Sequence, residues 1–479
     1  MKKERFMTKT ALSRILIFTT TISLAACAHT STGAVSRTTQ ADVSQTRNVD
    51  ILHTSVTRTV LPNGITVLVI PRPVVPVVSF RIGIRAGSSQ DPEGQYGLSD
   101  LTASLLDRGT QKHDALSIFR AIDSSGGGLD AQSGRDLTTV SGKVLTEDLE
   151  PLFSLAAEMV QTPTFPEEDF QKNQQMALAE LTDEKDHPGP VARTLLYKKM
   201  MGKGPYGHPE SGTIRTVSKL KRSDILSFYR KWYTPDRTII TFSGDISNEK
   251  ALALVKREFG SWKNREGSNQ TRSMNKTHWG NGGKTYLIDR EDLAQTTVLM
   301  GLPGISRKDP LFYNALVMNQ LVGGTTTSRL NHVIRQKMGL VYYIYSGLDA
   351  ERHRGPFFVS FQTHAENTAK VIKETRIQLQ KSARSTPDSK EVTAVKKNLL
   401  GSFPFRMDSD DRIASLLLFI ENYSLGIDYF TDYPQKISEV TPDSVKSAAQ
   451  TLIHTSSLTT VIAGPLSKMS GVTGQEIKP

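Results

Sequence analysis

Apolar residues recur along the chain in alternating periods that predict strands and helices. Within 60–70, two apolar runs flank Pro62-Asn63-Gly64, a sequence typical of a β-hairpin turn. The segments 77–84 and 238–244 are apolar and rich in β-branched residues, which predicts strands. Between them the apolar spacing predicts helices at 97–108, 114–124, 147–160, 167–186, 191–200 and 217–233.

A similar order begins again after a polar, glycine-containing stretch at 264–284, which we interpret as a linker. Strands are predicted at 296–301, 341–348, 356–363 and 458–464, and helices at 310–321, 328–337, 366–381, 388–400, 411–425 and 442–452. The repeated order indicates a diverged duplication. We therefore predict two homologous α+β domains, each a mainly antiparallel sheet with helices packed on one face. They would occupy 51–263 and 285–470, with a tail at 471–479.

The first 26 residues are interpreted as a lipoprotein signal peptide. Five basic residues precede or begin a short apolar stretch, which ends in Leu24-Ala25-Ala26-Cys27 and resembles a bacterial lipobox. Cys27 is then the expected lipidation site, and 27–50 a lipidated, flexible tether rich in Ser and Thr. This predicts a periplasmic protein held at a membrane by its lipid anchor. Because Ala28 rather than Asp follows the cysteine, the outer membrane is favoured over the inner; an ordinary signal peptide with an incidental Cys is the alternative.

Composition and charge narrow the functional classes. A chain of 479 residues with 37% hydrophobic and 22% charged residues is typical of a soluble globular protein with two or more domains. The formal net charge of +11 lies partly in the signal peptide and is otherwise spread out, so no nucleic-acid partner is expected. A single cysteine excludes an internal disulfide and a thiolate metal cluster.

The segment 97–110, Gly-Leu-Ser-Asp-Leu-Thr-Ala-Ser-Leu-Leu-Asp-Arg-Gly-Thr, resembles the zinc-site helix of the family that contains pitrilysin, insulinase and the mitochondrial processing peptidase. Other similar segments follow in order over nearly the whole mature chain, including 61–64, 128–131, 165–188, 205–209, 233–235, 244–245, 323–324, 328–330 and 335–342. The resemblance implies the fold of an inverted zinc metallopeptidase.

In active members of this family the helix carries His-x-x-Glu-His, in which two histidines bind zinc and the glutamate activates water. The corresponding positions here are Asp100, Ala103 and Ser104. The third ligand of the family, a glutamate on a later helix, corresponds to Glu180. No two of the ten histidines lie within four residues of each other, so the sequence offers no displaced histidine pair. The resemblance thus implies a chain that holds no zinc itself.

The segment 335–342 resembles the family segment that bears an Arg/Tyr pair and reaches the zinc site from the other domain. The resemblance assigns Arg335 to hold a substrate carbonyl or carboxylate, and Tyr342 to donate a hydrogen bond to the tetrahedral oxyanion. Tyr343 and Tyr345 are neighbouring alternatives for the tyrosine. The structural alternative is that Arg335 pairs with a surface acid and the tyrosines pack in a strand.

Three functions are open at this point. The leading hypothesis is a zinc-free subunit of a heterodimeric periplasmic metallopeptidase that acts on peptides; a homologous partner would carry the zinc, and Arg335 and Tyr342 would act in trans. The chain would then not be catalytic alone. The second hypothesis is a non-enzymatic scaffold or peptide-binding protein at the membrane. The third, a self-sufficient protease, would need zinc to bind Asp100 and Glu180 with a further ligand.

Overall fold

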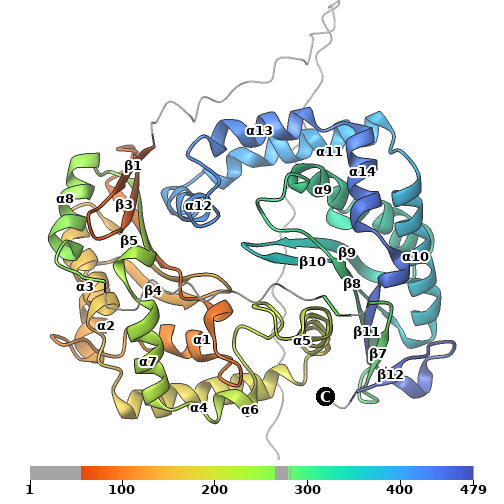
Figure 1. Ribbon diagram of the computed structural model, residues 1–479, viewed down its shortest axis with the longest axis horizontal. Coiled ribbons are helices and arrows are strands. Elements are labelled where there is room, and N and C mark those ends of the chain that lie inside the picture. Colours follow the sequence, from red (N-terminus) through yellow and green to blue (C-terminus); the bar gives the residue numbers. More distant parts are fainter. Residues whose placement is uncertain (1–55, 265–278, 281, 478–479) are drawn as a thin grey trace, which may run out of the picture. The chain divides into compact units, whose positions relative to one another are not determined.

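Six strands form a first sheet in the amino-terminal half of the chain (Figure 1). The computed structural model describes residues 56–264, 279–280 and 282–477. The strand order is β1-β2-β6-β3-β5-β4, and β2 and β6 are parallel while the other neighbours are antiparallel. The strands are β1 (Thr57–Val60), β2 (Thr66–Pro71), β3 (Val77–Ile84), β4 (Gly128–Ser133), β5 (Thr138–Leu145) and β6 (Thr238–Gly244).

The second half repeats this arrangement in the order β12-β7-β11-β8-β10-β9. Here β7 pairs in parallel with β11 and β12, and the remaining pairs are antiparallel. The strands are β7 (Thr285–Asp289), β8 (Gln295–Pro303), β9 (Val341–Ala350), β10 (Arg354–His364), β11 (Thr459–Gly464) and β12 (Gln475–Glu476). The predicted fold class, two α+β domains with mainly antiparallel sheets, is confirmed.

Helices cover the sheets with amphipathic faces. In the first half they are α1 (Leu98–Ala103), α2 (Ala115–Ser124), α3 (Leu149–Gln161), α4 (Glu167–Glu184), α5 (Pro188–Met201), α6 (Ile214–Val217), α7 (Arg222–Trp232) and α8 (Asn248–Phe259). In the second half they are α9 (Phe312–Asn319), α10 (Thr368–Arg384), α11 (Ser389–Ser402), α12 (Asp410–Asn422), α13 (Tyr429–Glu439) and α14 (Pro442–Leu452). Apolar residues of α3, α7 and α8 share one buried core with β2, β3 and β6.

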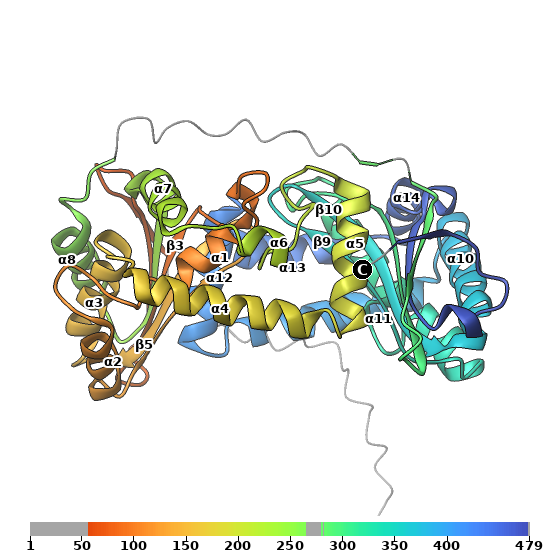
Figure 2. The ribbon, with the colours of Figure 1, turned by 90° about the horizontal axis from the view of Figure 1, so that it is seen from below.

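Each half also lends one helix to the other half's sheet. Helix α12 packs on β2, β3 and β6, whereas α5 packs on β8 and β11 (Figures 1 and 2). Glycines at matching positions allow the close approach: a Cβ atom on Gly83 would lie 2.4 Å from Leu418 Cδ1, and one on Gly301 would lie 2.4 Å from Met200 Sδ. Both sheets are therefore covered by helices on two faces where these exchanged helices lie.

Most predicted elements are present, with informative differences at their ends. The helix predicted at 97–108 stops at Ala103 and continues as turns, in which the Leu105 and Leu106 N–H groups donate to the carbonyls three residues earlier, those of Thr102 (3.4 Å) and Ala103 (3.1 Å). The helices predicted at 310–321 and 328–337 contain the π-helical segments η4 (Gln320–Gly324) and η5 (Asn331–Lys337). The helix predicted at 217–233 begins only at Arg222, after the short α6.

The predicted signal peptide, tether and most of the predicted linker lie outside the described residues. Among the helices of the described part, none has both the length and the apolar composition that a membrane span requires. The domain limits given above remain predictions.

Candidate functional site

The start of helix α1 is held in place by a buried carboxylate. Asp91 accepts hydrogen bonds from the backbone N–H groups of Gly97 (2.8 Å) and Ser99 (2.9 Å). Gly97 has φ +92°, and a Cβ atom there would lie 2.6 Å from the Ser211 carbonyl oxygen, so glycine is required for this turn. Burial raises the pKa of Asp91 to about 8. The chain thus has a well-fixed helix at the position that the resemblance assigns to the zinc motif.

The side chains on that helix differ from a metal site. Ala103 is buried, with 1% of its surface exposed, and its methyl group offers no donor atom. The Ser104 hydroxyl is engaged with the Leu101 carbonyl. Asp100 is half-buried, and its pKa is raised to about 6, first by burial and then by the charges of Glu180 and Glu210. Because the charge of Glu180 acts on Asp100, the two carboxylates lie near each other, as the resemblance implies for these two positions.

These residues do not fit the zinc ion of an active family member. Ala103 offers no donor atom and no base, and Ser104 is already hydrogen-bonded. Within the described residues, no group of three or more His, Cys, Asp or Glu side chains is arranged to hold a metal ion. The site therefore lacks the donor set that zinc requires. That the chain binds no zinc remains a prediction for metal analysis.

Arg335 and Tyr342 lie on two irregular pieces of backbone. Arg335 is exposed on the π-helical segment η5. Tyr342 lies in β9 where the register with β10 shifts between Gln362 and Thr363, and its side chain is 79% exposed. In the described part of the chain, neither side chain has a hydrogen-bond or ion-pair partner, so the surface acid expected for Arg335 in the structural alternative is not found there. Bulges and π-helical turns are frequent at functional sites.

The two neighbouring tyrosines point elsewhere. Tyr343 and Tyr345 line a cavity of about 420 Å³, together with Arg193 and Tyr197 of α5 and with His208. Burial raises the pKa of Tyr343. His208 stacks on Tyr96 with ring centroids 4.0 Å apart, and burial lowers the pKa of His208 to about 4. The structure therefore separates Tyr342, which faces outward, from the tyrosines that belong to the cavity.

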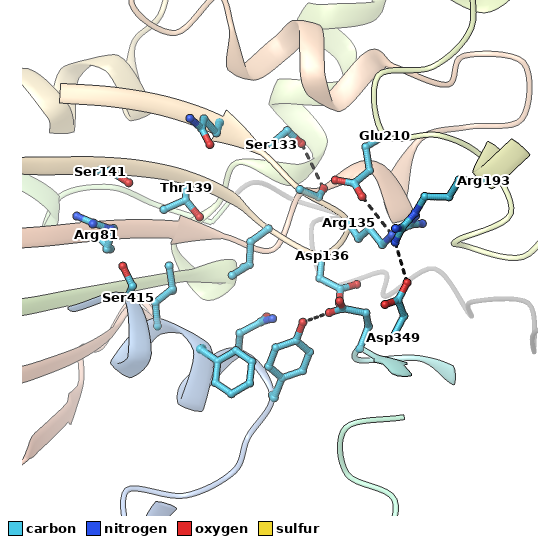
Figure 3. Close-up of a pocket in the computed structure, with 18 residues that line it drawn as sticks. Arg81, Ser133, Arg135, Asp136, Thr139, Ser141, Arg193, Glu210, Asp349 and Ser415 are labelled. Atoms are coloured by element: carbon cyan, nitrogen blue, oxygen red, sulfur yellow. Dashed lines mark hydrogen bonds and ion pairs between the residues drawn. The ribbon is translucent and has the colours of Figure 1, made fainter. Parts of the chain in front are cut away.

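A larger cavity of about 700 Å³ adjoins this one and shares Arg135, Arg193 and Glu210 with it. It lies between the β4–β5 hairpin, α12 and the turn after β9. Its ion pairs join Arg135 Nε to Glu210 (3.1 Å) and Arg193 Nη2 to Asp349 (2.9 Å). In Figure 3 these four residues and Asp136 gather at one end of the cavity, and Arg81, Thr139, Ser141 and Ser415 lie toward the other.

Two further carboxylates in this cavity are hydrogen-bonded to phenols. Tyr206 donates to both Asp136 oxygens (2.8 and 2.9 Å), and Tyr423 donates to Glu351. Burial raises the pKa of Asp136 to about 6, and the Glu351 charge raises it as well, although the Tyr206 hydrogen bond opposes both. No motif or periodicity in the sequence marks these residues as part of a site. Tyr206 stands in the 205–209 segment quoted for the resemblance, but no local pattern pairs it with a residue 70 positions away.

Two models of known protein families match the sequence of this chain. The model described as "Insulinase (Peptidase family M16)" matches residues 66–214, and that described as "Peptidase M16 inactive domain" matches residues 219–399. An uncharacterized zinc protease of Streptomyces coelicolor is 28% identical over 418 residues, which cover 86% of this chain and 90% of that protein. The uncharacterized zinc protease YmxG of Bacillus subtilis is 25% identical over 350 residues, 72% and 83% of the two chains.

Solved structures of other proteins also have a similar fold. The crystal structure of a peptidase M16 inactive domain from Pseudomonas fluorescens superposes with a TM-score of 0.80 at 26% identity, covering 89% of this chain and all of that one. A protease from Helicobacter pylori has a TM-score of 0.79 at 19% identity, a likeness of fold, with 86% and 99% coverage. Both family models, taken together, match most of the chain in the order of its two sheets. The chain belongs to the insulinase family of peptidases, family M16.

Proposed function

We propose that this chain is a zinc-free subunit of a heteromeric peptidase. A homologous chain with an intact zinc motif would supply the metal and the catalytic base. This chain would close the peptide-binding chamber and present Arg335 and Tyr342 to the substrate in trans. On this proposal the chain does not hydrolyse peptides alone, and zinc belongs to the partner.

The observation that carries the proposal is the contrast between the two segments. Helix α1 is fixed by Asp91 and Gly97, yet Ala103 and Ser104 offer nothing to a metal or to an attacking water. Tyr342, by contrast, is 79% exposed at a strand irregularity, and a side chain without a partner among the described residues would be available there to another molecule.

The chemistry assigned to the pair follows from their functional groups. A guanidinium holds a carbonyl or carboxylate oxygen through a planar pair of N–H donors. A phenol positioned at an oxyanion donates a hydrogen bond that strengthens as negative charge develops. Neither action requires a metal bound to this chain.

The substrate class suggested by the fold is an extended peptide. Strand β4 is an edge strand with β5 as its neighbour in the described structure, and exposed and half-buried side chains alternate along it. An extended segment is able to add to such an edge through backbone hydrogen bonds. The two adjoining cavities lie beside the β4–β5 hairpin and offer room for the side chains of such a peptide.

Localisation and anchoring are part of the proposal. The lipobox-like Leu24-Ala25-Ala26-Cys27 supports a lipid-anchored periplasmic protein, with Ala28 favouring the outer membrane. Lipid attachment at Cys27 would show as a mass increase and as partition into detergent, both lost in Cys27→Ser.

The test is turnover by the assembled complex. The chain is purified with its zinc-bearing partner from a detergent extract, and hydrolysis of a quenched fluorescent peptide is measured. Arg335→Ala and Tyr342→Phe are expected to lower kcat/KM by about 100-fold, the scale of losing one oxyanion donor. Assembly, followed by size-exclusion chromatography, should be unchanged.

Lys337→Ala is the matched control, because Lys337 is an exposed cation on the same segment η5. Equal turnover by all variants would remove the role in trans and favour the alternative, a scaffold or peptide-binding protein. That alternative is supported by the 700 Å³ cavity, which is built from this chain alone. Chelator-sensitive cleavage by the lone chain would contradict both.

A further inference from the structure

The larger cavity contains more negative than positive charge once its ion pairs are formed. Arg135 is paired with Glu210 and Arg193 with Asp349, and Arg81 is paired with Asp411. Asp136 and Glu351 also line the cavity, but their side-chain partners are the hydroxyl groups of Tyr206 and Tyr423. A phenol hydrogen bond leaves the charge of a carboxylate uncompensated.

The two carboxylates lie close to each other. Each acts electrostatically on the tyrosine of the other: Glu351 raises the pKa of Tyr206, and Asp136 raises that of Tyr423. Asp136 is 7% exposed. Besides the hydrogen bonds from Tyr206, it accepts one from the Arg352 backbone N–H (3.4 Å). The charge of the exposed Arg352 side chain lowers the pKa of Asp136, but in the described residues no ion pair joins Arg352 to either carboxylate.

A third group in the same cavity points to a ligand independently. Asn422, the last residue of α12, lines the cavity and is 3% exposed. Its Oδ1 atom is buried and has no donor among the described residues. A buried carbonyl oxygen without a donor costs free energy, and native structures satisfy nearly all such atoms. One kind of ligand group would satisfy both Asn422 Oδ1 and the two carboxylates. This group is a cation that carries N–H bonds.

We propose that Asp136, Glu351 and Asn422 form a binding site for the ammonium or guanidinium group of a peptide. The cation would compensate the two carboxylates and donate to Asn422 Oδ1, while the remainder of the peptide occupies the 700 Å³ cavity. The volume is within the range of cavities that bind small ligands. The site is separate from Arg335 and Tyr342, which do not line this cavity.

This inference deepens the proposed function by naming the peptides that the chamber prefers, and it rests on that function for the peptide nature of the ligand. Its test needs no partner and no turnover. Binding to the purified full chain is measured by isothermal titration calorimetry at pH 7.5 with three hexapeptides: one capped at both ends with a single arginine, the same peptide with neutral citrulline in place of arginine, and an uncapped peptide without basic side chains.

The arginine peptide is expected to bind at least 10-fold more tightly than the citrulline peptide. Asp136→Asn and Glu351→Gln should each remove most of this preference, because both keep an oxygen acceptor for the tyrosine but lose the charge. Asn422→Leu should weaken binding of the arginine peptide, whereas Glu366→Gln, an exposed acid outside the cavity, should leave it unchanged. Tight binding of the uncapped peptide would identify an amino terminus as the source of the cation.

Equal binding of the arginine and citrulline peptides, with no binding of the uncapped one, would overturn the proposal. So would a preference for arginine that survives the Asp136→Asn/Glu351→Gln double variant with an unchanged unfolding midpoint. Because turnover with the partner is not measured here, failure of this site leaves the result for Arg335 and Tyr342 unaffected.

Discussion

Gly83 of β3 lies directly beneath Leu418 of α12, so that a single added methyl group would come within 2.4 Å of Leu418 Cδ1. The contact joins the first sheet to a helix encoded more than three hundred residues later. We expect Gly83→Ala to destabilise the protein by about 1–3 kcal/mol, the usual cost of overpacking a core. Urea unfolding followed by circular dichroism measures it.

Two control variants test whether the contact between Gly83 and Leu418 is the cause. Gly128→Ala, where an added Cβ would meet no atom within 4 Å, should cost much less. In a Leu418→Ala background, Gly83→Ala should become nearly neutral because the clash is gone. An equal cost in both backgrounds would show that the close approach of α12 is not the reason for glycine at this position.

The zinc content of the purified protein is the second testable prediction. The purified protein is expected to hold far less than one zinc per chain after dialysis, because Ala103 and Ser104 provide no ligand. The triple variant Asp100→His/Ala103→Glu/Ser104→His restores the inverted motif opposite Glu180 and should bind zinc measurably. Inductively coupled plasma mass spectrometry reads both. One tightly held zinc per wild-type chain would refute the zinc-free assignment.

Asp136 gives a pH dependence with a defined sign. Burial raises its pKa in the folded protein to about 6, above the ordinary value of 3.8, so folding favours its protonated form. Its contribution to stability is therefore most favourable below about pH 4 and is lost as the pH rises through about 6. Relative to the wild type, Asp136→Asn should gain up to about 3 kcal/mol of unfolding free energy between pH 4 and pH 7.5.

The measurement is a series of urea unfolding curves of both proteins across that range. The quantity of interest is the difference between the two proteins at each pH, because the other carboxylates then cancel. Glu366→Gln, which changes an exposed acid outside the cavity, is again measured as the control. A difference for Asp136→Asn that stays constant would mean that Asp136 titrates normally.

Local sequence signals were sufficient for the elements that depend on neighbouring residues. Pro62-Asn63-Gly64 predicts the turn between β1 and β2, and Val60 indeed pairs with Thr66 across it. The predicted limits of β3 and β6 coincide with those observed. The pattern does not predict α8, α13 or β7, where short apolar faces are diluted by charged residues.

Some residues of the candidate site could be predicted from the sequence, and others could not. Asp100, Ala103, Ser104 and Glu180 were located by their similarity to a known motif, and the structure places Asp100 near Glu180. The pairing of Asp136 with Tyr206, or of Glu351 with Tyr423, depends on how distant turns and helices meet, and it has no periodic signal in the sequence. The exposure of Tyr342 rather than Tyr343 depends on a register shift between two strands, which alternation alone does not reveal.

The exchange of α5 and α12 has a consequence for the history and handling of this chain. If the polypeptide were severed between its repeats, each fragment would keep a sheet whose apolar surface around Gly83 or Gly301 had lost its cover, and each would carry an orphaned helix with nothing to shield. Separately expressed halves should thus be insoluble, yet reassociate when produced together. Neither half of the chain is therefore a complete folding unit without the other.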